Sequence, residues 1–273
     1  MAYPLIFSDL DGTLLNHHDY SFQEAVRALE EIRERKIPLI LNTSKTIPEV
    51  TKVREALYNH HPFVVENGAA ALIPQGYFPG CEKKLTEHIF GSHRDDFLPV
   101  IHNIRSAGNY SFKGFADFTA AQISAETGLS LDESENAKQR IASEPIQWLD
   151  DPDRMKQFQQ ELERNNLRLI KGGRFWHVMG DADKATAMNW LVAQYRKHKS
   201  NEIVVIALGD SQNDRLMLEQ ADIAAVIRSS TGGHLSISKP VNSVVYTDRP
   251  GAAGWQEAVD KIFKRLDTGY YYE

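Results

Sequence analysis

Two aspartates, two residues apart, are the first side chains in this sequence that could do chemistry. Asp9 and Asp11 lie in the segment DLDGTL, residues 9–14, directly after a short apolar run. In open α/β sheets ligands bind beyond the carboxyl ends of the strands, so we expect Asp9 to extend into such a crevice. Asp11 would follow on a sharp turn that Gly12 permits. The competing interpretation is an Asp-Gly turn with solvated carboxylates.

A second acidic cluster, GDSQND at residues 209–214, follows the most continuous apolar run of the chain, residues 203–208. Asp210 and Asp214 would lie across a turn that enters a helix. If the two strand ends meet, Asp9 and Asp210 form an oxygen-rich site, and oxygen ligands suit Mg²⁺. Carboxylates gathered without a cation would repel one another, which a metal ion resolves. Asp and Asn also favour helix N-caps, and both interpretations can hold together.

Hydroxyl and ammonium groups accompany these carboxylates. Thr43 or Ser44 offers a hydroxyl and Lys45 a point charge, directly after the apolar run 37–41. Lys184 precedes a helix that begins near Ala185, where it could neutralise a phosphate or pair with Asp9. The alternative for Lys184 is an exposed position at a helix start.

Strands and helices must bring these residues together. Apolar runs predict strands at 5–7, 37–41 and 63–65, and residues at helical spacing predict helices over 22–32 and 47–57. The pattern returns late in the chain, with helices over 188–195, 216–218 and 255–266 and strands at 203–208, 223–227 and 244–246. Continuous apolar strands between helices indicate an α/β fold, a doubly wound parallel sheet covered on both faces.

The middle of the chain, residues 84–173, has a different pattern. It is richer in polar residues, with predicted helices over 97–107, 120–127 and 155–164 among strands at 146–149 and 167–170. About 90 residues suffice for a small α+β domain. We therefore expect a core formed by 1–83 and 174–273, split by an inserted domain.

Composition excludes several classes of function. The 273 residues contain 31 Lys and Arg against 37 Asp and Glu, a net charge of −6, which gives no electrostatic reason to expect nucleic-acid or membrane binding. No apolar run approaches the ~20 residues that span a bilayer, and no secretory signal is visible, so we expect a cytoplasmic protein. The single cysteine, Cys81, can form neither an internal disulfide nor a thiolate metal cluster. Nothing indicates an obligate protein partner.

Taken together, DLDGTL at 9–14, Thr43, Lys184 and GDSQND at 209–214 resemble the four ordered motifs of the haloacid dehalogenase superfamily of phosphatases. The resemblance covers both core segments, and the insert resembles the α/β cap of the Cof-type subgroup. It implies a Rossmann-like core with an inserted cap, Mg²⁺ as cofactor and an aspartyl-phosphate intermediate.

The resemblance also implies a role for each motif residue. Asp9 would attack phosphorus, and Asp11 would protonate the leaving oxygen and then deprotonate water. Mg²⁺ would be held by Asp9, by the backbone carbonyl of Asp11 and by Asp210. The residues that support these groups would be Thr43 and Lys184, which bind the transferred phosphoryl group, Asp214, which orients Lys184 or a metal-bound water, and Asn213, which bonds the phosphate or its loop.

A closer resemblance is to the mannosyl-3-phosphoglycerate phosphatase family. It rests on the segments NTSKT at 42–46, ENGA at 66–69, AKQRIASEP at 137–145, GGRFWH at 172–177 and GDADK at 180–184. In one departure, Ala185 follows Lys184 where relatives often have Gly, but alanine should still begin a helix. The implied substrate is a small phosphorylated sugar acid.

That substrate carries a carboxylate and a sugar besides its phosphate. Arg140 and Arg174 have planar guanidinium groups that suit a carboxylate. His177 would bond the glycerate or pack beside Trp176. The remaining expected substrate contacts are Ser44, Lys45, Ser143 and the backbone at Gly173, with Glu66, Asn67 and Glu144 on sugar hydroxyls.

Other functions stay open at this point. A phosphatase for glucosyl-3-phosphoglycerate or another sugar phosphate would need the same groups. A phosphotransferase shares the core motifs but must exclude water, and the sugar-acid signature argues against it. A non-catalytic sugar-phosphate-binding or receiver-like module would need no acid/base group at Asp11.

Overall fold

The computed structural model describes residues 3–172, 174–240 and 243–268, and its centre is a parallel sheet. Five strands pair in the order β12-β11-β10-β1-β2, and every pairing is parallel. The strands are β1 (Tyr3–Ser8), β2 (Leu39–Leu41), β10 (Ile203–Gly209), β11 (Ile223–Arg228) and β12 (Val244–Pro250). The register pairs Ile6 with Ile206, so β1 and β10 end side by side. The predicted doubly wound core is confirmed.

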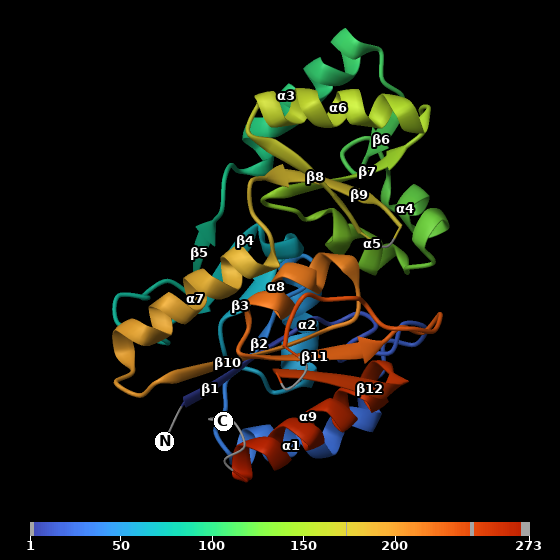
Figure 1. Ribbon diagram of the computed structural model, residues 1–273. Coiled ribbons are helices and arrows are strands. Elements are labelled where there is room, and N and C mark those ends of the chain that lie inside the picture. Colours follow the sequence, from blue (N-terminus) through green and yellow to red (C-terminus); the bar gives the residue numbers. More distant parts are fainter. Residues whose placement is uncertain (1–2, 173, 241–242, 269–273) are drawn as a thin grey trace.

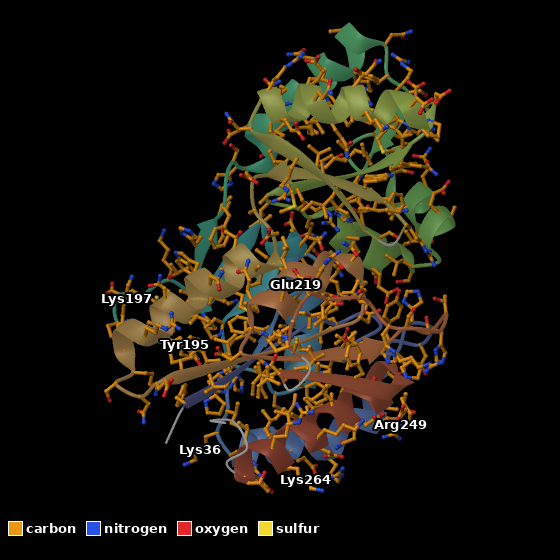
Figure 2. The ribbon with its side chains drawn as sticks, in the orientation of Figure 1. Lys36, Tyr195, Lys197, Glu219, Arg249 and Lys264 are labelled. Atoms are coloured by element: carbon orange, nitrogen blue, oxygen red, sulfur yellow. The ribbon has the colours of Figure 1, made fainter. Side chains whose placement is uncertain are left out.

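Helices cover both faces of this sheet (Figure 1). One face packs on α1 (Val26–Glu34), preceded by a 3-10 turn at Gln23–Ala25, and on α9 (Gly251–Asp267), while the other packs on α7 (Lys184–His198) and α8 (Arg215–Gln220). On α7, Tyr195 is only 1% exposed, whereas Lys197 lies on the outer surface (Figure 2). No helix in the described parts of the chain is long and apolar enough to cross a membrane. A further core helix, α2 (Ile47–Ala56), has Thr46 as its N-cap and Pro48 in its first turn.

The strand predicted at residues 63–65 forms, but not as a member of the parallel sheet. This strand, β3 (Phe63–Val65), starts an antiparallel sheet with β4 (Ala70–Pro74) and β5 (Leu85–Ile89). It meets β2 only through one bridge, Asn42 to Val64. A tight turn at Glu66–Gly68 reverses the chain directly after β3, so the next neighbour of β3 is β4.

The insert folds around a sheet of its own. Four antiparallel strands pair in the order β6-β7-β9-β8. They are β6 (Phe112–Gly114), β7 (Ser143–Trp148), β8 (Leu167–Lys171) and β9 (Trp176–Gly180). The helices α3 (Arg94–Gly108) and α6 (Pro152–Arg164) cover one face, and α4 (Ala120–Thr127) and α5 (Leu131–Lys138) lie toward the core (Figure 1). This unit is called the cap below.

The pairing of strands favours domain boundaries other than those expected from the sequence. The sequence assigned residues 174–180 to the core, but β9 pairs with β7 and β8 of the cap. It assigned residues 85–89 to the cap, but β5 pairs with β4 of the core. The two connections pass each other at Gly91 and Gly180, where a Cβ on Gly91 would lie 2.9 Å from the Cα of Gly180. We therefore propose that the cap spans residues 92–180.

The central strand predicts a measurable stability difference. Ile206 is fully buried in β10, so Ile206→Ala should lower the free energy of unfolding by about 2–5 kcal/mol, through lost burial and a residual cavity. The control is Leu216→Ala, because Leu216 is 43% exposed and its truncation should change that free energy by less than about 0.5 kcal/mol. Urea denaturation of both variants measures the difference. Equal losses would contradict the packing described for β10.

Candidate active site

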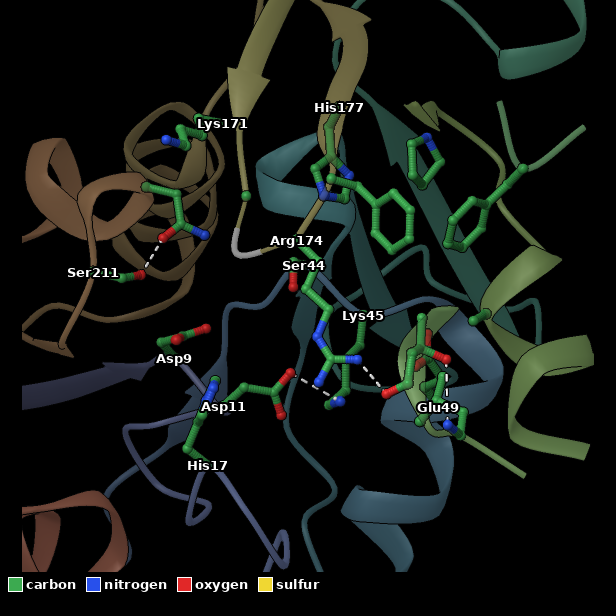
Figure 3. Close-up of a pocket in the computed structure, with 18 of the residues that line it drawn as sticks. Asp9, Asp11, His17, Ser44, Lys45, Glu49, Lys171, Arg174, His177 and Ser211 are labelled. Atoms are coloured by element: carbon green, nitrogen blue, oxygen red, sulfur yellow. Dashed lines mark hydrogen bonds and ion pairs between the residues drawn. The ribbon is translucent and has the colours of Figure 1, made fainter. Parts of the chain in front are cut away.

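A cavity of about 640 Å³ lies between the core and the cap, at the carboxyl ends of β1 and β10 (Figure 3). The core lines it with Asp9, Asp11, Ser44, Lys45, Asp210 and Asn213, and the cap lines it with Phe115, Arg140, Arg174 and His177, among others. The predicted acidic segments therefore do meet at one opening, although the chain places them about 200 residues apart.

A buried ammonium group connects the ends of three core elements. Lys184, the first residue of α7, is 1% exposed, and its Nζ lies 2.6 Å from Asp9 Oδ1 and 2.6 Å from Asp214 Oδ1. Burial lowers the pKa of Lys184, but the Asp214 and Asp9 carboxylates outweigh it, and the pKa lies above its usual value. Lys184 is therefore a cation held between two carboxylates, rather than an exposed residue at a helix start.

Asp214 uses both of its oxygens within the protein. Oδ1 accepts from Lys184, and Oδ2 accepts from the backbone N–H groups of Asp210 at 3.1 Å and Ser211 at 3.0 Å. Gly209 allows this approach, because a Cβ there would lie 2.5 Å from the Asp214 Cβ. Asp214 thus holds Lys184 and shapes the turn that carries Asp210.

Three carboxylates gather at this point. Oxygens of Asp9, Asp210 and Asp214 lie within 4.8 Å of one another. Asp210 also accepts from the Thr13 hydroxyl at 2.9 Å, and the positive φ of Gly12, +82°, brings the backbone against the Asp210 carboxylate. Burial, followed by the charge of Asp214, raises the pKa of Asp9 and raises that of Asp210 to about 7.

This donor set suits a divalent cation. One ammonium leaves the three carboxylates with excess negative charge, and the cluster offers only oxygen ligands. Because both oxygens of Asp214 are already bonded, Asp9 and Asp210 are the better ligands. The side chain of Asp11 is not part of the cluster.

Asp11 pairs instead with Lys45. Asp11 Oδ2 lies 2.9 Å from Lys45 Nζ, and the other oxygen, Oδ1, is buried without a hydrogen-bond partner among the described residues. The Lys45 ammonium lies 4.8 Å from the centre of the Tyr20 ring. Burial lowers the pKa of Lys45, but the charges of Asp11 and Glu49 raise it by more, so the pKa lies above its usual value. Asp11 therefore has one oxygen held in place and one open to a new partner.

Thr43 is not among the described residues that line the cavity. It is fully buried, and its hydroxyl accepts from the backbone N–H of Lys45 at 3.3 Å. Its neighbours Ser44 and Lys45 line the cavity directly.

Two arginines and a histidine form much of the cap wall. Arg140 donates to the Ser143 hydroxyl at 3.0 Å and to the Ser44 carbonyl at 3.3 Å, so it bridges cap and core. Arg174 donates to the carbonyls of Glu126 and Thr127 at the end of α4. His177 is 7% exposed, and burial, followed by the charge of Arg140, lowers its pKa to about 3. The imidazole is therefore neutral at pH 7.

Four residues expected at the substrate are buried in the protein instead. None of the four lines the cavity in the described structure; they are Glu66, Asn67, Ser143 and Glu144. Glu144 accepts from Arg94 at 2.6 Å and from the Ala116 N–H at 2.8 Å, and burial raises its pKa. Asn67 accepts from Asn213 at 2.9 Å. Buried polar groups usually have hydrogen-bond partners. Glu66, Ser143 and Glu144 have theirs within the fold, whereas Asn67 Nδ2 has none among the described residues. Gly173 lies outside the described residues.

Sequence reasoning also missed part of the wall. The additional lining residues include His17, Tyr20, Glu49, Phe115, Lys171 and Gln212. Lys171 and Gln212 carried a signal, since Lys171 adjoins the segment at 172–177 and Gln212 lies within the segment at 209–214. Phe115 carried none, because an apolar residue in an irregular stretch looks the same whether it lines a cavity or a core.

Comparisons with known proteins agree with this geometry. The model of the haloacid dehalogenase-like hydrolase family matches residues 6–241. A Persephonella marina protein named glucosyl-3-phosphoglycerate/mannosyl-3-phosphoglycerate phosphatase is 35% identical, over 97% of this chain and 99% of its own. A Methanococcoides burtonii protein of the same name is 36% identical, over 93% and 95%. A solved structure from Thermoplasma acidophilum, 19% identical, superposes with a TM-score of 0.64 over 98% of this chain and 99% of that one. The chain belongs to the haloacid dehalogenase-like hydrolase family.

Proposed function

We propose that this enzyme is a Mg²⁺-dependent phosphatase that hydrolyses mannosyl-3-phosphoglycerate to mannosylglycerate and phosphate. One observation carries the proposal: Asp9, bonded to a buried lysine, lies at a cavity whose opposite wall bears Arg140, Arg174 and a neutral His177. Glucosyl-3-phosphoglycerate is a second candidate substrate, because both curated relatives carry the two substrates in their names.

Asp9 is the proposed nucleophile. Lys184 bonds its Oδ1, and no described residue bonds its Oδ2, which leaves that oxygen for attack on phosphorus. A new bond from Asp9 to phosphorus would form as the bond from phosphorus to the glycerate oxygen breaks. The product of this step is an aspartyl phosphate and a free alcohol.

Asp11 is the proposed acid and base. It would give a proton to the departing glycerate oxygen and then take one from the water that attacks the aspartyl phosphate. That second attack releases phosphate and restores Asp9. The contact of Asp11 with Lys45 supports this assignment, because it fixes one carboxylate oxygen beside the cavity.

The remaining core groups would bind charge. Asp9, Asp210 and the backbone carbonyl of Asp11 would hold Mg²⁺, which, when bound, offsets negative charge on the transferred phosphoryl group. Lys184 and the Thr43 hydroxyl would add to this stabilisation, and Asn213, which lines the cavity, would bond the phosphate.

The cap would recognise the rest of the substrate. Arg140 and Arg174 suit the glycerate carboxylate, because a guanidinium group can donate two parallel hydrogen bonds. A neutral His177 suits a hydroxyl group, and its Nδ1 is buried without a partner among the described residues. Lys171 would add positive charge at the same wall.

The test of this function is phosphate release from a panel of esters with Mg²⁺. The panel contains mannosyl-3-phosphoglycerate, glucosyl-3-phosphoglycerate, mannose 6-phosphate, sucrose 6-phosphate and 3-phosphoglycerate, with EDTA as control. We expect a strong preference for the two glycosyl-3-phosphoglycerates, because only they offer both a carboxylate and a sugar. Weak and even turnover of all five would contradict the substrate assignment and leave the phosphatase chemistry intact.

Replacement of the nucleophile should remove nearly all activity. Asp9→Asn should lower kcat by at least about a thousandfold, because the covalent route is lost while the side-chain volume is kept. Asp19→Asn is the matched control, since Asp19 is exposed and is not among the residues that line the cavity. Steady-state phosphate release measures both variants. Substantial activity in Asp9→Asn would assign the nucleophile elsewhere.

Metal affinity should depend on pH through Asp210. Its pKa is raised to about 7 in the metal-free chain, so a proton competes with the cation below that pH. The Mg²⁺ association constant should therefore rise from pH 6 to pH 8, by up to about tenfold per pH unit below the pKa. Calorimetric titration at several pH values measures this slope. Because the pKa of Asp9 is raised too, a comparably steep slope in Asp210→Asn would assign the competing proton to Asp9 instead.

A further inference from the structure

The turn Glu66–Gly68 has an unusual backbone. Glu66 and Asn67 both have positive φ, 54° and 60°, in succession. Residues other than glycine rarely adopt a positive φ. This backbone conformation costs energy and persists only where the surrounding contacts enforce it. The contacts of the turn therefore need an explanation.

The turn contacts three of the core segments that carry proposed catalytic residues. The Asn67 N–H donates to the carbonyl of Thr43 at 2.9 Å, and its side-chain oxygen accepts from Asn213. Gly68 packs on the backbone directly before Lys184. A Cβ on Gly68 would lie 2.5 Å from the backbone nitrogen of Lys184. The turn thus fixes three of the core segments around the cavity relative to one another.

Glu66 extends from this turn into the cap. Its side chain is fully buried, and it accepts from Ile141 N–H at 2.8 Å, from Ala142 N–H at 3.2 Å and from the Ser143 hydroxyl at 2.7 Å. The Glu66 carboxylate therefore accepts two backbone N–H groups of the loop that joins α5 to β7 and the hydroxyl of Ser143, the first residue of β7. This is a charge-assisted connection between the core and the cap.

The connection continues to the cavity. The Ser143 hydroxyl that donates to Glu66 also accepts from Arg140 Nη1 at 3.0 Å. Arg140 lines the cavity and has a further bond to the Ser44 carbonyl of the core. A continuous path of hydrogen bonds therefore leads from Glu66 through Ser143 to the Arg140 guanidinium.

We propose that Glu66 is a positioning residue that acts through Ser143 to fix Arg140 over the reacting groups. Through the turn it shares with Asn67 and Gly68, it sets where the cap cation lies relative to Asp9 and Lys184. The kinetic part of this inference rests on the proposed function, because it assigns Arg140 to a substrate carboxylate.

The kinetic test compares a substrate with a carboxylate and one without. Glu66→Gln keeps the side-chain volume but replaces one accepting carboxylate oxygen with an NH₂ group, which faces the hydrogen-bond donors of the loop. It should lower kcat/KM for mannosyl-3-phosphoglycerate by about tenfold, mostly through KM, and change that for p-nitrophenyl phosphate by less than about twofold. Ser143→Ala should act in the same direction. The double variant should fall no further than Glu66→Gln alone, since both act on one path.

A matched control separates positioning from general loosening of the cap. Arg168→Gln removes different contacts, those of Arg168 on β8 with Asp181, the Ala182 carbonyl and Asp183 beyond the cap, and none of them involves Arg140. It should change kcat/KM for both substrates by the same factor. Equal losses for both substrates in Glu66→Gln, or additive losses in the double variant, would overturn the proposal.

Amide hydrogen exchange tests the connection without any substrate. Glu66→Gln should speed exchange at Ile141 and Ala142 by about tenfold or more and leave α6 unchanged, whereas Ser143→Ala should leave both amides protected. Unchanged exchange at both amides in Glu66→Gln would overturn the positioning role. If the wild-type enzyme hydrolyses p-nitrophenyl phosphate but not the mannosyl ester, the proposed function fails, and exchange alone decides this inference.

Discussion

The rest of the structure depends on the burial of one ammonium group between two carboxylates. Lys184 is the first residue of α7, where the positive end of the helix dipole disfavours a cation. Asp9, directly after β1, and Asp214, after β10, compensate for this, each with an oxygen 2.6 Å from Lys184 Nζ. Removal of one partner of a buried pair typically costs about 3–5 kcal/mol, because an unpaired charge remains. The contact therefore fixes the ends of three elements that are distant in sequence, and it does so beside the cavity.

The elements of the core could be predicted because their burial leaves a clear pattern. Strands β1 and β10 are buried on both faces, so each is an unbroken apolar run, and the helices have one apolar face. The partner of β3 could not be predicted in the same way. Phe63–Val65 is as apolar as a parallel strand, and its antiparallel pairing depends on the turn at Glu66–Gly68. The Asn67-Gly68 pair is typical of tight turns, but the apolar run alone favoured a parallel strand, and the positive φ of Glu66 has no sequence signal.

The candidate site divides along the same line. The acidic segments, Lys184 and Lys45 could be predicted because charged residues at strand ends have few other reasons to gather. The buried polar residues of the cap could not. Glu66 and Glu144 were expected at sugar hydroxyls, yet Glu66 bonds the loop before β7 and Glu144 bonds Arg94. The residue type determines that a carboxylate accepts hydrogen bonds. Which donors lie within hydrogen-bond distance is determined only by the folded structure.

The crossing of the two connections at Gly91 and Gly180 has a consequence for the history of such chains. The ends of the intervening segment are in contact, and the central sheet contains no strand from it. A core of this kind tolerates exchange of the whole segment, because its own ends would already be adjacent. Exchange of this one module would change the cap wall of the cavity and leave the carboxylates and the lysine of the core in place.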